Sequence, residues 1–168
     1  MSDPDDFESS ALVREVRQLL KQGALREAES RVAERLARFP ESADAWYMRG
    51  VIANRREDYA AAVAALRKAI AISPDAALAW LALGTAFARS DALPDAAEAY
   101  RAAIERAPAW ADGHFNLGVV LKRQGDRLGA MRALHAAWVR DPMFFDAARQ
   151  CVATLAECVR LGEVHDTA

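Results

Sequence analysis

The residues of this chain that most readily bind metals or attack substrates are few, and their spacing does not suit a site. Cys151, Cys158 and His165 follow one another at steps of seven residues. Within a helix each such step separates the side chains by roughly 10 Å, whereas zinc ligands must all lie within about 2.3 Å of one ion. His114 and His135 each stand alone in predicted helices. We therefore expect neither a metal site nor a cofactor.

The motifs that mark common catalytic sites are also missing from the sequence. It contains no G-x-x-x-x-G-K-[ST] phosphate-binding loop, no G-x-S-x-G nucleophile turn and no H-E-x-x-H metal motif. The eight glycines are scattered along the chain, and no carboxylate pair stands out as an acid–base couple. The sequence therefore predicts that the protein is not an enzyme.

Arginine offers the clearest candidate chemistry, which is the binding of acidic groups. Arg17, Arg55, Arg89 and Arg123 follow one another at nearly regular intervals, the last two of which are thirty-four positions each. A guanidinium can hold a carboxylate through two parallel hydrogen bonds, so this row predicts a partner with acidic residues. The alternative interpretation is that each arginine is a solvated helix end, because a cation is favoured near a helix C-terminus.

The same interval of thirty-four positions recurs in other residue types and predicts a repeat architecture. Four prolines, Pro40, Pro74, Pro108 and Pro142, are separated by this interval each time. Other positions keep the same period: Gly50, Gly84 and Gly118; Ala28, Ala62, Ala96 and Ala130; Ala69, Ala103 and Ala137; and Trp46, Trp80 and His114. Chance does not give five coincident columns at one spacing.

Each repeat is predicted to contain two helices joined by a short turn. Asp58 and Asp126 are placed to accept hydrogen bonds from free amides at the start of the second helix, and Gly23 and Gly125 occupy the turn. The closing prolines cannot continue the second helix. Glycine in the middle of a helix costs up to about 1 kcal/mol, so Gly50 and its equivalents predict a close approach of the two helices.

These columns resemble the tetratricopeptide repeat, whose pattern is W-x2-L-G-x2-Y followed by A-x3-F, A and P. The third copy carries the pattern best, with Trp80, Leu83, Gly84, Phe87, Ala96, Tyr100, Ala103 and Pro108. The second copy has Arg49 where leucine is usual, and the first copy is degenerate. The resemblance implies an all-α fold, a right-handed α-solenoid of antiparallel helix pairs.

The period also divides the chain into segments. We expect an acidic tail over 1–8, four repeats over 9–142 and a short tail over 162–168; the repeats are 9–42, which is degenerate, 43–76, 77–110 and 111–144. Residues 143–161 are predicted to form a C-terminal capping helix, because a repeat array needs a terminal cover with a polar outer face. Its apolar face is expected to comprise Ala148, Cys151, Val152, Leu155 and Val159.

The resemblance further implies where a partner would bind. In this family the first helix of each repeat lines a concave groove that usually holds a peptide segment of another protein. When the groove positions of the family are assigned to this sequence by their place in the repeat, the implied groove has an apolar centre and a ridge of arginines. Such a groove would suit a peptide with apolar anchors and acidic flanks. The groove residues are Arg17, Tyr47, Met48, Val51, Arg55, Leu78, Leu81, Thr85, Arg89, Phe115, Asn116, Val119 and Arg123.

The implied role is an adaptor or chaperone-like module, and two alternatives stay open. The repeats could associate through their ends into an oligomeric scaffold, using Trp110, Met143, Phe144 and Phe145. The protein could also be an accessory subunit of an enzyme or modification complex, which differs from the adaptor only in its partner.

Charged residues predict two contacts within the chain. Glu15 and Arg49 occupy equivalent places in adjacent repeats, and Arg35 lies near the same layer. This arrangement predicts an ion pair between the first two repeats. Phe7 lies among acidic residues and could fill the basic groove, although a disordered solubilising tail is the simpler interpretation.

Composition narrows the class of the protein and its surroundings. The chain has 168 residues, 39 of them alanine, and a net charge of -2; its acidic ends leave about +4 for residues 11–161. That excess is too small to predict nucleic-acid binding. The longest uncharged stretch, 76–88, is shorter than the roughly 20 residues of a membrane-spanning helix, and no signal peptide is visible. The two cysteines are too far apart to bridge each other, so we expect a reducing cytoplasm, and the arginine-rich usage resembles that of high-GC bacteria.

Overall fold

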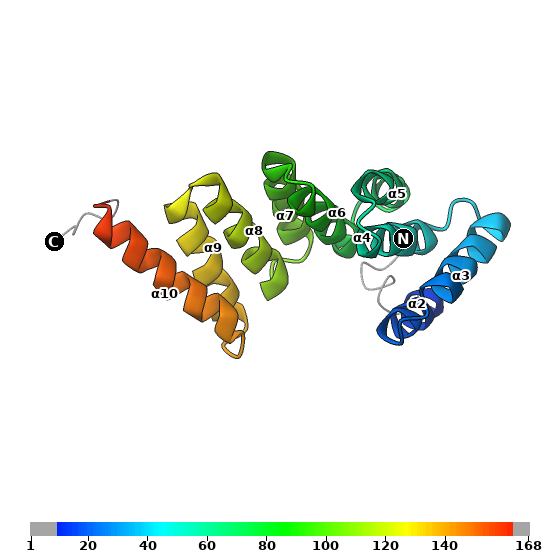
Figure 1. Cartoon of the computed structure of the whole chain (residues 1–168), viewed down its shortest axis with the longest axis horizontal. Coiled ribbons are helices and arrows are strands. Elements are labelled where there is room, and N and C mark those ends of the chain that lie inside the picture. Colours follow the sequence, from blue (N-terminus) through cyan, green and yellow to red (C-terminus); the bar gives the residue numbers. More distant parts are fainter. Residues whose placement is uncertain (1–9, 163–168) are drawn as a thin grey trace. The chain divides into compact units, whose positions relative to one another are not determined.

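The computed structural model describes residues 10–162, so the predicted tail 1–8, with Phe7, and nearly all of the predicted tail 162–168 lie outside the described residues. Every regular element within 10–162 is an α-helix, which confirms the predicted all-α class (Figure 1). The helices are α2 (Ala11–Lys21), α3 (Leu25–Arg38), α4 (Ala43–Arg55), α5 (Tyr59–Ile72), α6 (Ala77–Arg89), α7 (Leu93–Arg106), α8 (Ala111–Gln124), α9 (Arg127–Arg140) and α10 (Phe145–Arg160).

The chain divides into two compact units between α6 and α7. Unit 1 extends to Ser90 and contains α2 to α6, and unit 2 begins at Asp91 and contains α7 to α10. In unit 1, α4 packs against α5, and α4 also touches α2 and α6. In unit 2, α8 packs against α9, and α9 packs against α10. Each closely packed pair consists of consecutive helices joined by a short turn.

Small residues allow the two helices of a pair to approach closely, as the glycine columns predicted. A Cβ atom built on Gly118 of α8 would lie 2.7 Å from Cγ of Leu134 in α9. A Cβ atom on Gly50 of α4 would likewise lie 2.8 Å from Cδ2 of Leu66 in α5. Real Cβ contacts are not that short, so only glycine fits without movement of a buried leucine.

The turns between paired helices share one backbone feature. Gly23, Glu57, Asp91 and Gly125 lie one repeat period apart, and their φ angles are 76°, 62°, 65° and 86°. Glycine adopts this left-handed conformation freely, whereas other L-residues lose roughly 1–2 kcal/mol there. Two of the four turns therefore hold a non-glycine residue in a costly conformation.

Aspartates begin two of the second helices, which confirms the predicted N-caps. The side chain of Asp58 accepts a hydrogen bond from the backbone N–H of Ala61 at 3.0 Å. The side chain of Asp126 accepts one from the backbone N–H of Gly129 at 2.8 Å. Each bond satisfies an amide that has no partner within its own helix, so each aspartate fixes the start of its helix after the turn.

The periodic aromatic position ties each first helix to the loop before it. Trp46 and Trp80 donate their indole N–H groups to the carbonyl oxygens of Pro40 and Pro74, at 2.7 and 2.9 Å. His114 replaces the tryptophan in unit 2, and its Nε2 lies 3.2 Å from the carbonyl oxygen of the proline six residues earlier. Burial lowers the pKa of His114, and this hydrogen bond only partly offsets the effect.

The last helix packs through a different face from the one predicted. Ala147 and Cys158 of α10 are fully buried, whereas Val152, Leu155 and Val159 are 67%, 41% and 61% exposed. The predicted inner face was therefore wrong for these three residues. The physical reason is that small side chains let α10 lie close to α9, so the bulky apolar side chains are left on the outside.

Candidate functional site

The predicted groove residues of unit 1 lie on α2, α4 and α6, and polar side chains link these three helices. Nη2 of Arg17 donates to the hydroxyl oxygen of Tyr47 at 3.3 Å, which joins α2 to α4. Nδ2 of Asn54 donates to the carbonyl oxygen of Ala82 at 3.2 Å, which joins α4 to α6. These bonds, together with the packing of α4 on α2 and on α6, hold the three helices next to one another.

Two arginines of the predicted ridge bind the end of the preceding first helix. Nη1 of Arg55 donates to the carbonyl oxygen of Leu20 at 2.8 Å, and Nη1 of Arg89 donates to that of Asn54 at 3.3 Å. Both acceptors lie in the last turn of a helix, where carbonyl groups lack helical partners and a cation is favoured. The arginines thus stabilise a neighbouring helix end, and each guanidinium has further N–H donors.

Burial separates the predicted apolar centre of unit 1 into two classes. Met48 has no exposed surface and Tyr47 is 5% exposed. Met48 is therefore a core residue in this structure rather than part of an open groove. Val51 of α4, and Leu78, Leu81 and Thr85 of α6, are partly exposed. These four side chains form the surface that a partner could touch without rearrangement of the core.

Asn54 stands out because one of its side-chain atoms is buried without a partner. The residue is 8% exposed, and its Oδ1 accepts no hydrogen bond. A buried acceptor without a donor costs roughly 1–3 kcal/mol. No sequence signal indicated this unpaired atom.

Unit 2 holds the remaining predicted groove residues on α8. Phe115, Asn116 and Val119 are partly exposed, and the ring centroids of Phe115 and Phe144 lie 4.6 Å apart. Arg123 forms an ion pair with Asp91 at 2.8 Å. The Arg123 guanidinium therefore already has an acidic neighbour within its own unit.

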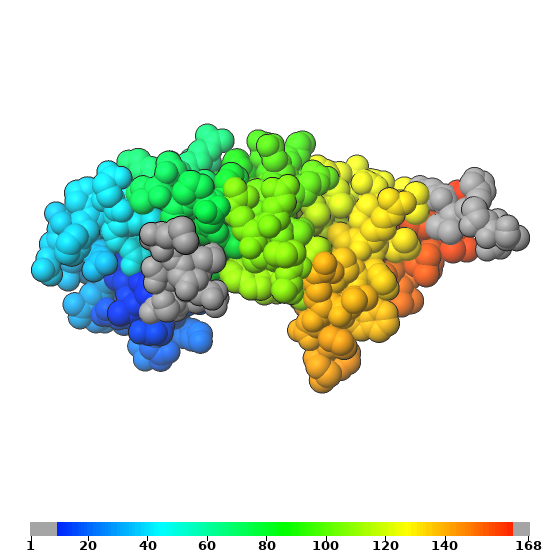
Figure 2. All heavy atoms as spheres, turned by 180° about the vertical axis from the view of Figure 1, so that it is seen from behind, coloured from blue at the N-terminus to red at the C-terminus, as the bar shows by residue number. Residues whose placement is uncertain are grey.

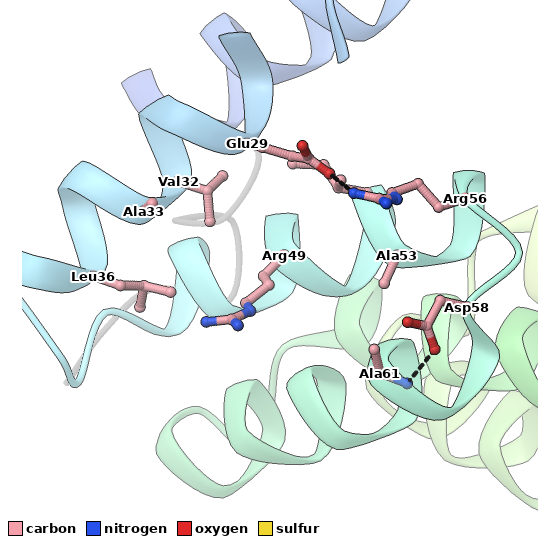
Figure 3. A pocket seen from close by; sticks show the side chains of 10 residues that line it. Glu29, Val32, Ala33, Leu36, Arg49, Ala53, Arg56, Asp58 and Ala61 are labelled. Atoms are coloured by element: carbon pink, nitrogen blue, oxygen red, sulfur yellow. Dashed lines mark hydrogen bonds and ion pairs between the residues drawn. The ribbon is translucent and has the colours of Figure 1, made fainter. Parts of the chain in front are cut away.

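A hollow that the sequence did not predict lies between α3, α4 and α5 of unit 1 (Figure 3). Its volume is about 390 Å³, its floor is apolar and charged side chains stand at its rim. Its lining residues are Glu29, Val32, Ala33, Leu36, Arg49, Ile52, Ala53, Arg56, Asp58 and Ala61.

Arg49 is one of the residues that line this hollow. The residue occupies a position where the repeat pattern has leucine, and its guanidinium stacks 5.3 Å from the Trp46 ring centroid. Among the described residues no carboxylate pairs with Arg49, while Arg56 at the other side of the rim binds Glu29 at 2.5 Å. The departure from leucine was one sequence signal for the hollow.

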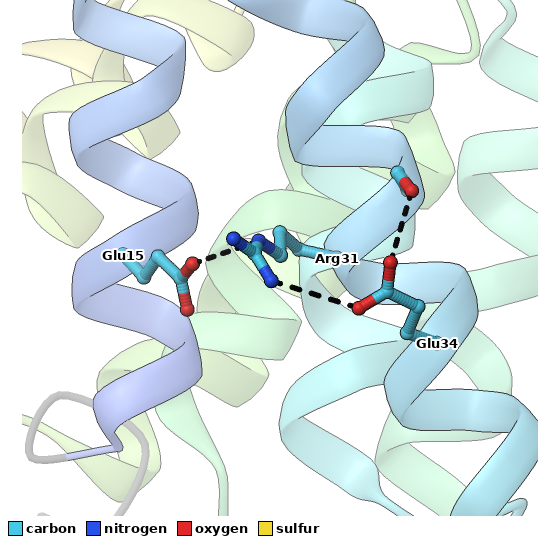
Figure 4. Close-up of polar contacts among 4 residues, drawn as sticks. Glu15, Arg31 and Glu34 are labelled. Atoms are coloured by element: carbon cyan, nitrogen blue, oxygen red, sulfur yellow. Dashed lines mark hydrogen bonds and ion pairs between the residues drawn. The ribbon is translucent and has the colours of Figure 1, made fainter.

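The ion pair predicted for Glu15 has a different partner. Glu15 of α2 binds Nε of Arg31 in α3 at 3.0 Å, and Arg31 also lies 3.7 Å from Glu34 (Figure 4). Among the described residues, neither Arg35 nor Arg49 forms an ion pair with Glu15, so that prediction was wrong. Both sides of the Glu15 pair are about half exposed, so the pair contributes little stability.

The candidate metal chemistry finds no counterpart in the part of the chain that the structure describes. Within residues 10–162 no three histidine, cysteine or acidic side chains come together as ligands. Cys151 and Cys158 are both free thiols, and burial raises the pKa of Cys151. No helix within the same residues is long and apolar enough to cross a bilayer.

Comparison with known proteins points to one family. A family profile described as "Tetratricopeptide repeat" matches residues 13–77 and 55–111, which is more than half of the chain. No curated protein sequence matches the chain closely enough to be a recognisable relative.

Several solved structures share the fold at low sequence identity. A crystal structure of MamA has a TM-score of 0.77 at 20% identity, covering 84% of this chain and 83% of that one. YrrB, described as "a TPR protein with an unusual peptide-binding site", has a TM-score of 0.71 at 23% identity, covering 87% and 75%. TTC0263 of Thermus thermophilus, a thermophilic TPR protein, has a TM-score of 0.76 at 17% identity, covering 92% and 82%. At these identities the likeness shows the fold alone.

Proposed function

The chain belongs to the tetratricopeptide repeat family, whose fold generally serves protein–protein interaction without catalysis, and we propose that unit 1 binds a peptide segment of a partner protein. The binding surface is the face formed by α2, α4 and α6. The protein acts as a non-catalytic adaptor or chaperone-like module, and its partner carries apolar anchors with acidic flanks. The cytoplasmic location expected from the cysteines belongs to the same proposal.

The observation that carries this proposal is the partly exposed apolar surface on α4 and α6. Beside it, Nδ2 of Asn54 donates to the carbonyl oxygen of Ala82 and joins the two helices. Val51, Leu78 and Leu81 provide partly exposed apolar surface on the same helices. The likeness to YrrB, a protein described by its peptide-binding site, adds support of a general kind.

The arginines around this surface explain the preference for acidic flanks. Arg55 uses one N–H group for the carbonyl oxygen of Leu20, and a guanidinium has five such donors in a planar fork. A carboxylate of the partner can bind the remaining donors while the intramolecular bond persists. In unit 2, Phe115, Asn116 and Val119 of α8 are partly exposed, and we keep them as a candidate surface of that unit by itself.

A peptide array tests the proposal with a matched pair of variants. The array carries peptides with an apolar residue flanked by Asp or Glu, and the same peptides with Asn or Gln in their place. Val51 and Val63 are both partly exposed valines, on α4 and α5 respectively. We expect the acidic peptides to bind, Val51→Glu to abolish binding, and Val63→Glu to retain it.

Two results would contradict the proposal. One is retained binding in Val51→Glu with its helices intact, which would show that the face of α4 does not hold the peptide. The other is equal binding of the acidic and amide peptides, which would remove the role of the arginines. Circular dichroism of both variants shows whether the helices remain intact.

A further inference from the structure

The hollow between α3, α4 and α5 is lined by a side of α4 that the proposed peptide surface does not use. Arg49, Ile52, Ala53 and Arg56 line it from α4, and their spacing of three, one and three residues places them on one side of that helix. At 3.6 residues per turn, Val51 of the peptide surface lies on the opposite side. The volume of about 390 Å³ is within the roughly 300–1,000 Å³ of small-ligand pockets. The hollow is therefore a separate candidate site of unit 1.

The next repeat of unit 1 shows what the equivalent place holds when it is filled. Ala53 and Ala33 line the hollow, and one repeat period later stand Phe87 of α6 and Arg67 of α5. The guanidinium carbon of Arg67 lies 5.9 Å from the centroid of the Phe87 ring. An aromatic ring covered by a long side chain thus occupies the equivalent place, whereas the hollow has two alanines there.

A second position differs between the two repeats in the same sense. Leu83 of α6 stands one period after Arg49 and is only 4% exposed. Arg49 is exposed and stands at the rim of the hollow. Compared with the next repeat, the hollow therefore lacks the ring of an aromatic side chain and gains a positive charge.

The charges around the hollow are divided between its two ends (Figure 3). Arg56 and Glu29 form their ion pair at one end, and Asp58 lies towards the same end. Arg49 stands seven residues before Arg56, which is roughly 10 Å along α4, and its side chain points away from both carboxylates. The carboxylates that line the hollow therefore leave the guanidinium of Arg49 unpaired.

A second cation lies close to Arg49. The guanidinium carbon of Arg49 is 5.3 Å, and Nζ of Lys68 is 4.2 Å, from the centroid of the Trp46 ring. Both cations are exposed, and within residues 10–162 neither forms an ion pair. An anion that reaches this end of the hollow therefore meets two positive charges beside one indole.

We propose that the hollow binds a small aromatic carboxylate. The ring of the ligand lies over Ala53, where the next repeat places the ring of Phe87, and the carboxylate accepts two parallel hydrogen bonds from Arg49. Ala33 of α3 and Ala61 of α5 line the hollow and are exposed, so the site is open to solvent. Figure 2 shows α3, in light blue to cyan, and α5, in blue-green, at the surface of unit 1.

NMR spectra of the backbone amides of the full chain test the proposal with three probes. Phenylacetate carries both ring and charge, phenylacetamide carries only the ring, and acetate carries only the charge. We expect phenylacetate to shift the amide signals of Ala33, Ala53 and Ala61, which line the hollow. It should bind about three- to fivefold more tightly than phenylacetamide, because an ion pair at an exposed site is modest. Acetate should cause the smallest shifts.

Two matched pairs of variants separate the ring from the charge. Ala53→Phe supplies the side chain of the next repeat and should abolish binding of phenylacetate, whereas Ala60→Phe, at an exposed alanine of α5 outside the hollow, should retain it. Arg49→Gln should bind phenylacetate no more tightly than phenylacetamide. Arg67→Gln, which removes an arginine outside the hollow, should keep the preference of the parent chain. Arg49 is exposed, so its variant tests the charge even where a phenylalanine at position 53 disturbs the fold.

Three results would overturn the proposal. The first is the absence of any shift of these amide signals at the highest soluble concentration of phenylacetate. The second is equal binding by the parent chain and a folded Ala53→Phe variant. The third is equal affinity of the parent chain for phenylacetate and phenylacetamide. Val51→Glu should bind phenylacetate like the parent chain, so this site and the proposed peptide surface succeed or fail separately.

Discussion

The left-handed turn residue Glu57 gives a sharp test of the energetics of this fold. Its φ angle is 62°, and its side chain forms no hydrogen bond or ion pair with any described residue. The left-handed conformation costs an L-residue about 1–2 kcal/mol, and glycine avoids this cost. Glycine is also more flexible in the unfolded chain, which lowers the gain by about 0.5–1 kcal/mol. We expect Glu57→Gly to raise the free energy of unfolding by about 0.5–1 kcal/mol.

Urea and thermal unfolding measure this change. For a chain of this size, about 1 kcal/mol corresponds to a shift of roughly 2–4 °C in Tm, so Glu57→Gly should raise Tm by about 1–4 °C. Glu57→Ala should give no comparable gain, because alanine keeps the strained backbone. Gly125→Ala, at the equivalent turn of unit 2, should lower the free energy of unfolding by about 0.5–1 kcal/mol. If Glu57→Ala stabilises as much as Glu57→Gly, the reasoning from backbone conformation is refuted.

Three further variants probe other contacts. Arg55→Ala should lower the free energy of unfolding in a urea titration by about 1 kcal/mol, because α2 loses a charge-assisted hydrogen bond at a partly exposed site. The control is Arg14→Ala, which removes an exposed arginine of α2 that makes no such bond. It should have no measurable effect in the same titration. His114→Trp should reduce the pH dependence of stability. Burial lowers the pKa of His114, so on acidification the unfolded chain takes up the proton first. The stability of the parent chain therefore falls as the pH drops below about 6.5. Unfolding at pH 8 and pH 5.5 shows whether His114→Trp loses less stability than the parent. Gly118→Ala should lower the free energy of unfolding by about 1–3 kcal/mol, because the new methyl group meets Leu134. A Tm unchanged from the parent would show that α8 and α9 can move apart.

The sequence predicted most reliably what depends on backbone geometry. The repeat period located the helix pairs, the N-caps Asp58 and Asp126, and the close approach at Gly50. These features follow from the conformational needs of glycine, proline and capping residues, which act within a few positions along the chain. The aromatic column was also found, although its hydrogen bonds to the proline carbonyls were not foreseen.

Long side chains and helices with two apolar sides account for most of the errors. Arg55 extends to a carbonyl group 35 residues earlier in the sequence, and no local pattern shows which distant acceptor a flexible arginine will choose. For the same reason, the sequence did not show that Glu15 would pair with Arg31. Apolar periodicity in α10 could not tell that Ala147 and Cys158 would face inward, because close packing favours small residues over more hydrophobic ones.

The indole hydrogen bonds supply the molecule with optical probes at known places. Trp46 and Trp80 make the same contact with consecutive loops of unit 1, and an indole that loses such a bond and enters water changes its fluorescence. The equivalent residue of unit 2 is His114, which does not emit. Variants with phenylalanine at Trp110 and Trp138 could keep only Trp46 or only Trp80. The fluorescence of each variant would then report when its own loop opens. Comparing the two would give the order in which neighbouring repeats unfold, using native side chains as probes.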